Sequence, residues 1–350
     1  MSNKTSTLNI PSESLEGHVS LATSKSRYVR YFFVGMACLF PVLVVLGFTP
    51  SYRDFSNGSF KPHWFVHVHG ALMAGWLFIF LTQTFLAARD NLKYHRQLGM
   101  FSVFYGAIIC LLMPTTSIRA RIAFPSPVED FLWNILAVEL CAFGMFTLFF
   151  VWGILVRKNA AAHKRLLLMA TLVLMGAAID RMRWLPRFEN GLFSNFAYLD
   201  ALLIPLFVYD YFSVGRIHKI TLLGSACLVT AQLLVGAVWE SPAWHRFWFN
   251  RFAPFVEQVV EIKLSDAQTD PLLGDYGDKN WHMTLGRDDG GKLYLKLPDQ
   301  PSLEVGAISA NELFLKTATW KLSFERDADG RVTKIINTQA ATTWEAARLP

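Results

Sequence analysis

The chain has 350 residues, of which 53% are hydrophobic, 14% are aromatic and only 17% are charged. An ordinary soluble domain is about 25% charged, so this composition excludes a disordered chain, a coiled coil and a conventional soluble enzyme. The net charge of +6 is not gathered into one basic run, which argues against nucleic acid as a partner.

The charge divides the chain into two parts. Residues 1–259 carry 22 Lys and Arg against 13 Asp and Glu, whereas residues 260–350 carry 11 against 14. A basic, apolar first part and an acidic, polar second part indicate two domains in different solvents. We therefore expect an all-α polytopic membrane protein with about seven transmembrane helices and a small C-terminal antiparallel β domain.

Residues 1–26 are polar and rich in Ser and Thr, which predicts a disordered cytosolic leader. Seven apolar segments follow, each close to the ~20 residues that a helix needs to cross ~30 Å of hydrocarbon. They are residues 30–49, 64–88, 98–114, 131–156, 163–180, 197–214 and 220–239. Together they predict a transmembrane domain over residues 27–240.

The connecting loops predict how the bundle is oriented. Every second loop is basic and nearly free of acids: Lys25 to Arg30, Arg89 to Arg96, Arg157 to Arg165, and Arg216 to Lys219. Because cytosolic loops carry an excess of Lys and Arg, this set is expected in the cytosol. The prediction is a bacterial inner membrane protein with a cytosolic amino terminus and a periplasmic carboxyl-terminal domain.

The last hundred residues change in pattern. Aromatic and Arg residues alternate over Trp244–Phe252, so residues 241–274 are predicted as an interfacial amphipathic linker. Residues 275–350 are predicted as the β domain. Its expected strands are Trp281–Leu285, Lys292–Leu297, Ser302–Val305, Glu312–Lys316, Trp320–Glu325 and Val332–Asn337, with Gly-containing turns at residues 288–291 and 327–330.

Histidines mark three helix starts that the predicted topology places on the cytosolic side. His95, His163 and His218 are each followed by a basic residue at the beginning of an apolar segment, and Asp210 lies at the same depth. A helix amino terminus disfavours a protonated imidazole, and a neutral imidazole is what a metal or haem iron binds. The alternative is that these histidines sit among lipid headgroups while the basic neighbours snorkel outward.

A second group, His63, His67 and His69, opens the second segment on the other side. His67 and His69 point about 200° apart on a regular helix, so no single metal is expected to bind both. Four carboxylates lie within the segments, at Glu139, Asp180, Asp200 and Asp210, and are functional candidates because unpaired charge in a membrane is costly. Asp180 is expected to pair with Arg181, and Asp200 and Asp210 to occupy opposite ends of one helix.

The chain resembles a bacterial family of multi-pass membrane proteins without an established activity, through the pattern His67-x-His69-Gly70…Trp76…Gln83…Asn91…His95-Arg96-x-Leu98-Gly99, His163-Lys164-Arg165-Leu166 and Tyr209-Asp210…Gly215-Arg216-x-His218. The spacing of His69 and Met73 and the run His95–Gly99 are also similar to two-haem transmembrane cytochromes. That likeness implies haem b bound near the membrane surfaces.

The tail resembles a different group. Leu293–Pro298, Glu312–Leu315 and Leu322–Val332 are similar to the lipocalin-like β domain appended to serine β-lactamase-like peptidases. That domain is non-catalytic, and the Ser-x-x-Lys pair of the peptidase is missing here. The resemblance implies an accessory module for a periplasmic protein or a small apolar ligand.

Three functions stay open, because the chain also lacks GxSxG, GxxxxGK followed by Ser or Thr, GxGxxG and HExxH motifs. One is a membrane redox protein that binds haem b or another metal through His67, His95, His163 and His218. Another is a zinc-dependent membrane hydrolase with the metal held by His95, His163, His218 and Asp210. The third is a non-catalytic sensor or assembly factor in the lipid bilayer, whose outer β domain binds a partner.

Overall fold

A computed structural model gives the fold of the chain. It describes residues 12–56, 61–62, 64–122, 130–188, 191–252, 254, 260–278, 281–288, 290–298, 302–316, 320–339 and 342–350, with the side chains of residues 12–28, 54, 61, 119–122, 130–132, 339 and 342 left out. The predicted leader at residues 1–26 lies partly outside this range, and residues 12–26 are the first turns of the first helix.

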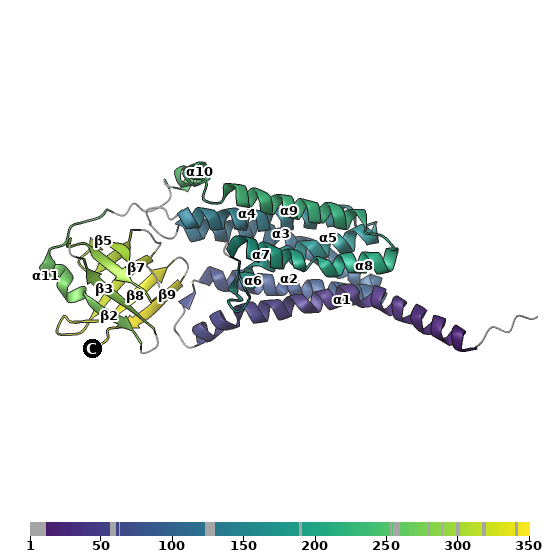
Figure 1. The fold of residues 1–350 in the computed structure, drawn as a ribbon, viewed down its shortest axis with the longest axis horizontal. Helices are drawn as coiled ribbons and strands as arrows, with labels where there is room; N and C mark the ends of the chain where they lie inside the picture. The colour runs from purple at the N-terminus through teal and green to yellow at the C-terminus, as the bar shows by residue number, and fades with distance from the viewer. Residues whose placement is uncertain are drawn as a thin grey trace, which may run out of the picture.

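Seven helical spans in the described residues are long and apolar enough to cross a membrane, as the sequence predicts. They form one elongated bundle (Figure 1). Its helices are α1 (Ser12–Ser56), α2 (Trp64–Ala88), α3 (Leu92–Ile122), α4 (Asp130–Leu155), α5 (Ala160–Val173), α6 (Gly176–Arg181), α7 (Gly191–Ala201), α8 (Ile204–Val214) and α9 (Lys219–Val238). The expected fold class, an all-α membrane bundle followed by a β domain, is confirmed.

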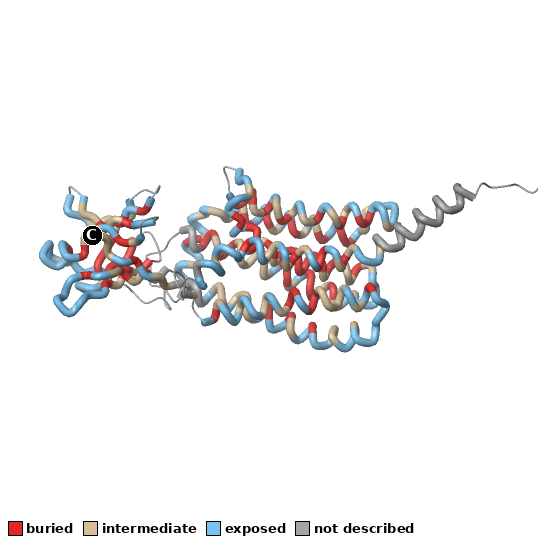
Figure 2. The backbone as a smooth tube through the Cα atoms, turned by 90° about the horizontal axis from the view of Figure 1, so that it is seen from below, coloured by how far each residue is buried: buried red, intermediate tan, exposed pale blue. Residues whose placement is uncertain are grey.

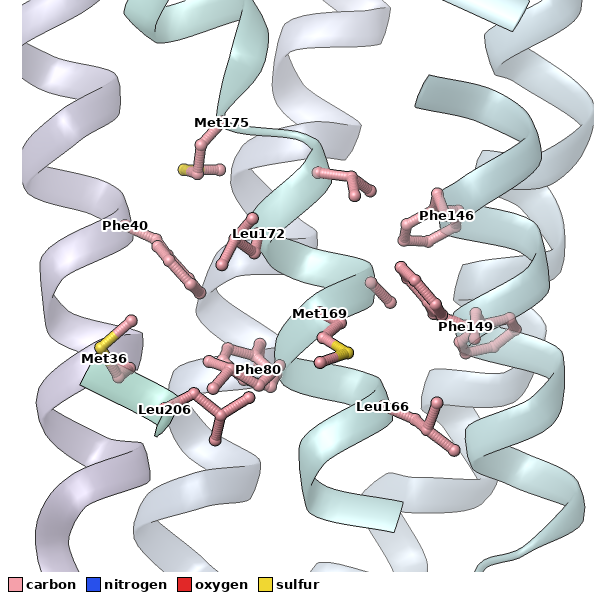
Figure 3. Close-up of a cluster of buried hydrophobic side chains, with 14 of the residues drawn as sticks. Met36, Phe40, Phe80, Phe146, Phe149, Leu166, Met169, Leu172, Met175 and Leu206 are labelled. Carbon is pink, nitrogen blue, oxygen red and sulfur yellow. The ribbon is translucent and has the colours of Figure 1, made fainter. Parts of the chain in front are cut away.

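The fifth span, α5 with α6, lies at the centre of the bundle. About two thirds of its most apolar window is buried, the largest share of any span. Leu166, Met169 and Leu172 of α5 pack between Phe40 of α1 and Phe149 of α4 (Figure 3). Buried residues accordingly gather along the middle of the bundle, and exposed ones along its rim (Figure 2). This arrangement suits a protein whose rim faces lipid.

Spans 5 and 6 are both interrupted near their middles, which the sequence-based segments did not predict. The N–H of Leu174 bonds to Thr171 O at 3.3 Å and the N–H of Leu203 bonds to Asp200 O at 2.9 Å, so each helix tightens to three-residue turns there. Pro205 follows the second break and has no N–H to donate, which accounts for the new helix α8 beginning at Ile204. Asp200 thus lies at the middle of the span, not at one end as expected.

The helix α10 (Pro242–Phe252) follows the bundle and packs against the first turns of α4. Trp244 Nε1 donates to Trp133 O at 2.8 Å, and His245 Nε2 lies 2.9 Å from Asn134 Oδ1. Phe247 and Phe249 are exposed on the same helix. The helix therefore combines polar anchors to the bundle with exposed aromatic rings.

The C-terminal domain is an antiparallel sheet that curls into a near-barrel. Its strands pair in sequence order: β2 (Gly274–Gly277), β3 (His282–Arg287), β4 (Leu293–Lys296), β5 (Leu303–Ser309), β6 (Glu312–Leu315), β7 (Trp320–Arg326), β8 (Val332–Gln339) and β9 (Thr342–Ala347). A bridge between Tyr276 and Arg348 brings the first and last of these strands together. The sequence predicted β3 to β8 but not β2, which contains two glycines, or the alanine-containing β9.

The β domain has its own hydrophobic core, to which all eight strands contribute. Trp320, Leu322 and Phe324 of β7 point inward at every second position, as a half-buried strand requires. Leu264 and Leu272 pack against the same core, and Ile262 bridges to Ala307, so the domain begins before residue 275. The helices α11 (Asp266–Thr269) and η2 (Asp270–Leu272) lie in this segment.

The β domain and the first turns of α1 lie at opposite ends of the molecule (Figure 1). A short strand between α1 and α2, β1 (Lys61–Pro62), pairs with β9 and joins the bundle to the domain. The opposite end carries Arg30, Lys93, Arg157 and Lys219, and we call it the basic end. It is where α3, α5 and α9 begin.

Candidate functional site

The basic end brings together two of the predicted histidines. His95 lies in the first turn of α3 and His163 in the first turn of α5, as predicted. Their ring centroids are 6.5 Å apart and their ring planes are nearly perpendicular, at 89°. Each ring is held by a helix other than α3 and α5: α2 holds the His95 ring, and α4 holds the His163 ring.

Both rings are fixed through Nδ1. His95 Nδ1 lies 3.3 Å from the carbonyl oxygen of Gln83 on α2, and His163 Nδ1 lies 2.8 Å from that of Gly153 on α4. A carbonyl oxygen only accepts hydrogen bonds, so each Nδ1 carries a proton, and in the neutral form of each ring Nε2 keeps its lone pair. A backbone carbonyl on one ring nitrogen is a common support for a histidine that binds metal through the other nitrogen.

His218 has the opposite tautomer. It caps α9, and its Nδ1 accepts the N–H of Ile220 at 3.1 Å, so the proton of the neutral ring is on Nε2. Burial and the nearby Arg165 guanidinium hold the pKa of His218 below its ordinary value, although Asp210 opposes the shift. His218 is therefore a neutral helix cap whose second ring nitrogen, Nε2, is a hydrogen-bond donor.

Asp210 is the centre of a buried ion pair with Arg165. The Arg165 side chain is 2% exposed and Asp210 is 0% exposed. Arg165 Nε donates to Asp210 Oδ1 at 2.9 Å, and its terminal nitrogen donates to the same oxygen. Asp210 Oδ2 accepts the N–H of His218 at 3.0 Å and the hydroxyl of Thr221. The carboxylate thus ties α5, α8 and α9 together.

Lys164 extends the cluster toward α1. Its Nζ donates to Tyr209 Oη at 2.8 Å and lies 4.8 Å from the centroid of the Phe33 ring. Phe32 stacks on Tyr209 with ring centroids 4.4 Å apart. Cations over aromatic faces are stabilised by the ring quadrupole, so this group holds the start of α5 against α1.

Gln83 is a site residue that was not singled out as a candidate from the sequence. Its carbonyl holds His95, its side-chain Nε2 lies 3.2 Å from Ser102 Oγ, and its buried Oε1 has no hydrogen-bond partner in the described part of the chain. The supporting carbonyls of Gln83 and Gly153 could not be recognised in the sequence, because every residue except the last has the same backbone carbonyl group.

His67 and His69 lie far from this pair. They are on the first turns of α2, about 21–24 Å along that helix from Gln83 at 1.5 Å per residue. His67 is exposed and its ring contacts Phe55, whereas the Nδ1 of His69 is buried and unpaired among the described residues. The predicted set His67, His95, His163 and His218 therefore divides between two ends of the bundle. His63 is outside the described residues.

The predicted zinc ligands are not assembled in the described structure. Within the ranges given above, no group of three or more His, Cys, Asp or Glu side chains is placed to hold a metal ion. The Asp210 carboxylate is hydrogen-bonded to Arg165, and His218 Nδ1 is hydrogen-bonded to the N–H of Ile220 at the start of α9. What remains is one pair, His95 and His163.

Comparisons with protein-family models, with curated proteins and with solved structures find no match for this chain. Its function is therefore argued from the geometry of the basic end.

Proposed function

We propose that this integral membrane protein is a redox protein that binds haem b at its basic end, where His95 and His163 would hold the haem iron. The observation that carries the proposal is the pair of imidazoles whose Nδ1 atoms are held by backbone carbonyls and whose Nε2 atoms are free. The likeness of the His95–Gly99 run to two-haem transmembrane cytochromes supports it.

The number of ligands favours haem over zinc. A zinc site takes three or four protein ligands, whereas haem brings four nitrogens of its own and needs at most two from the protein. The described residues offer two histidines at this point and no third ligand. A pair is what a haem site needs and is too few for a zinc hydrolase.

The separation of the rings is compatible with the proposal. Two imidazoles whose Nε2 atoms face each other across one metal ion, with metal–nitrogen bonds of about 2.0–2.1 Å, would have ring centroids about 6.5 Å apart. The centroids of His95 and His163 are 6.5 Å apart in the structure.

The residues of this chain hold the ligands in place. The carbonyls of Gln83 and Gly153 fix the tautomer and the direction of each ring, and raise the basicity of the free nitrogen. Arg165 and Asp210 fix the start of α5 against α8 and α9, which positions His163 two residues earlier. When bound, haem supplies a one-electron couple between ferric and ferrous iron.

We further propose that the basic end faces the cytosol of a bacterium and the β domain faces the periplasm. The basic loops of alternate helices support this orientation. The β domain would then be a lipocalin-like module that binds a periplasmic protein or a small apolar ligand, and its curled antiparallel sheet is compatible with that resemblance.

The test is the haem content of the purified full chain after haem-replete expression. We expect haem in the wild type, and its loss in both His95→Ala and His163→Ala. The matched control is His282→Ala, at an exposed histidine of β3, which keeps its haem. A wild type without haem, or single variants with wild-type haem content, would refute the proposed ligands.

A further inference from the structure

A line of polar side chains runs through the bundle between spans 6 and 7. At the basic end, Thr221 of α9 donates its hydroxyl to Asp210. Near the middle of the bundle, Gln232 of α9 donates from Nε2 to Asp200 Oδ1 at 2.9 Å. Ser225 lies between them on α9, and we call Thr221, Ser225 and Gln232 the polar stripe.

The polar stripe follows one face of α9. At 100° per residue, Ser225 lies about 40° and Gln232 about 20° around the helix from Thr221, and the stripe is about 16 Å long. Thr221 and Gln232 both bond to span 6, so this face is turned toward that span. Ser225 Oγ is buried and makes no hydrogen bond within the described residues. A buried hydroxyl of this kind is suited to hydrogen-bond a water.

Asp200 ends the line at the break between α7 and α8. It is the penultimate residue of α7 and lies close to the midpoint of the span Gly191–Val214. Its backbone carbonyl oxygen accepts a hydrogen bond from the N–H of Leu203, which closes a three-residue turn. Pro205 keeps the helix interrupted beyond this turn. Interrupted helices within a membrane commonly mark the sites where ions or protons bind.

No charged side chain in the described structure contacts Asp200. Of the elements packed against α7, α4 carries Asp130 and Glu139, α6 carries Asp180 and Arg181, and α9 carries only Lys219 at the basic end. Asp180 pairs with Arg187 at 3.4 Å, and the Arg181 guanidinium lies 4.5 Å from the Phe48 ring centroid. Among the described residues, the hydrogen-bond partner of the Asp200 carboxyl is the neutral amide of Gln232. An ionised carboxylate without a cation is costly at this depth.

We propose that Asp200 is a proton-binding site in the middle of the membrane, and that it exchanges protons with the basic end along the polar stripe. The proton passes from the basic end along the hydroxyls of Thr221 and Ser225 by way of water and binds to a carboxylate oxygen of Asp200, while Asp210 keeps its ion pair with Arg165. The neutral acid keeps its hydrogen bond from Gln232. This site is independent of the haem proposal, since it shares none of its ligands.

Infrared spectroscopy of the full chain in lipid vesicles tests the site. Replacing water by deuterium oxide in acidic buffer shifts the carbonyl stretching band of each exchanging protonated carboxyl group. We expect one such band to disappear in Asp200→Asn and to persist in Asp180→Asn, a carboxyl group near the other end of the bundle. A wild type without that band, or an unchanged band in Asp200→Asn, would overturn the proposal.

The rate of the same shift tests the route. Ser225→Leu blocks the stripe, whereas Ala226→Leu adds a larger side chain on the exposed face of the same turn. Because Ser225→Leu removes one hydrogen-bonding position from the stripe, we expect it to slow deuterium exchange at Asp200 roughly tenfold. Ser225→Ala should also slow this exchange, but by a smaller factor. Ala226→Leu exchanges at the wild-type rate. If all three variants exchange as fast as the wild type, the polar stripe is not the route.

Discussion

Arg165 and Asp210 are the most deeply buried ionic groups of the bundle, and they join three helices. A buried pair contributes little net stability when it is intact, but removing one partner leaves the other charge unpaired in the interior. The main effect of each residue is therefore to keep the buried charge of the other one paired.

The first prediction concerns this pair. Asp210→Asn keeps an acceptor for Thr221 but leaves the Arg165 charge unpaired, so we expect the free energy of unfolding to fall by about 3–5 kcal/mol. Asp180→Asn, whose partner Arg187 is partly exposed, is the control and should change it by about 0.5 kcal/mol or less. Unfolding of both variants by denaturing detergent gives the comparison, and equal losses would contradict the role of burial.

The second prediction concerns His218 and pH. Because the pKa of His218 is lower in the folded chain than in the unfolded chain, the unfolded state binds its proton more readily. This residue's contribution to stability is therefore lost as pH falls below the unfolded value of about 6.5. In His218→Asn the cap acceptor remains and the titration is gone.

We expect thermal unfolding curves of the wild type to shift downward with acidification more than those of His218→Asn. Parallel shifts in the two proteins would show that another group is responsible.

At the level of single residues, the sequence predicted which histidines lie at the basic end but not how they are held. Their positions follow from helix starts, which hydropathy reveals. The supporting carbonyls carry no sequence signal, and the tautomer that separates His218 from His95 and His163 depends on them. The sequence placed Arg165 in a basic loop and Asp210 at the depth of the histidines, but it did not predict that the two form an ion pair.

Close packing between helices depends on glycine at the contact of α1 with α6. A Cβ at Gly47 would lie 2.3 Å from the carbonyl oxygen of Ala178, whereas a Cβ at Gly35 of the same helix would meet no atom within 4 Å. Small residues at such contacts let helix backbones approach in membranes.

The third prediction compares these two glycines. Gly47→Ala forces α1 and α6 apart and should lower the free energy of unfolding by about 1–3 kcal/mol. Gly35→Ala should leave it unchanged or raise it by about 0.5–1 kcal/mol, since Ala favours the helix. The detergent-unfolding assay distinguishes them, and similar values for both variants would show that the α1–α6 contact is loose.

Segments with uniform hydropathy were well predicted at the level of elements. The second span was predicted over residues 64–88, which are the bounds of α2. Helix α3 was predicted over residues 98–114 but covers Leu92–Ile122, because helices continue beyond the hydrocarbon and membrane helices tolerate a proline such as Pro114. The breaks in spans 5 and 6 were missed, since apolar residues continue through both.

The molecule as a whole places its β domain and its basic end at opposite ends of an odd number of spans (Figure 1). The sequence predicted this layout because charge and hydropathy change together near residue 260. It did not predict that β1, from the loop between α1 and α2, joins the β domain by pairing with β9. Two strands that lie so far apart in the chain leave no pattern in their local sequences that would predict their pairing.

The fourth prediction concerns orientation. Alkaline phosphatase fused after Pro350 should be active, because it folds only outside the cytosol, and green fluorescent protein fused at the same point through the same export route should be dark. The reverse pattern would place the β domain in the cytosol and the basic end outside.

Under the proposed function, His95 and His163 together hold one haem. The decisive measurement is the absorption spectrum of the detergent-purified full chain, oxidised and then reduced with dithionite. We expect a Soret band and sharp α and β bands on reduction, as in low-spin iron with two histidine ligands, and their loss in His163→Ala. A colourless protein, or a high-spin spectrum that His163→Ala leaves unchanged, would contradict it.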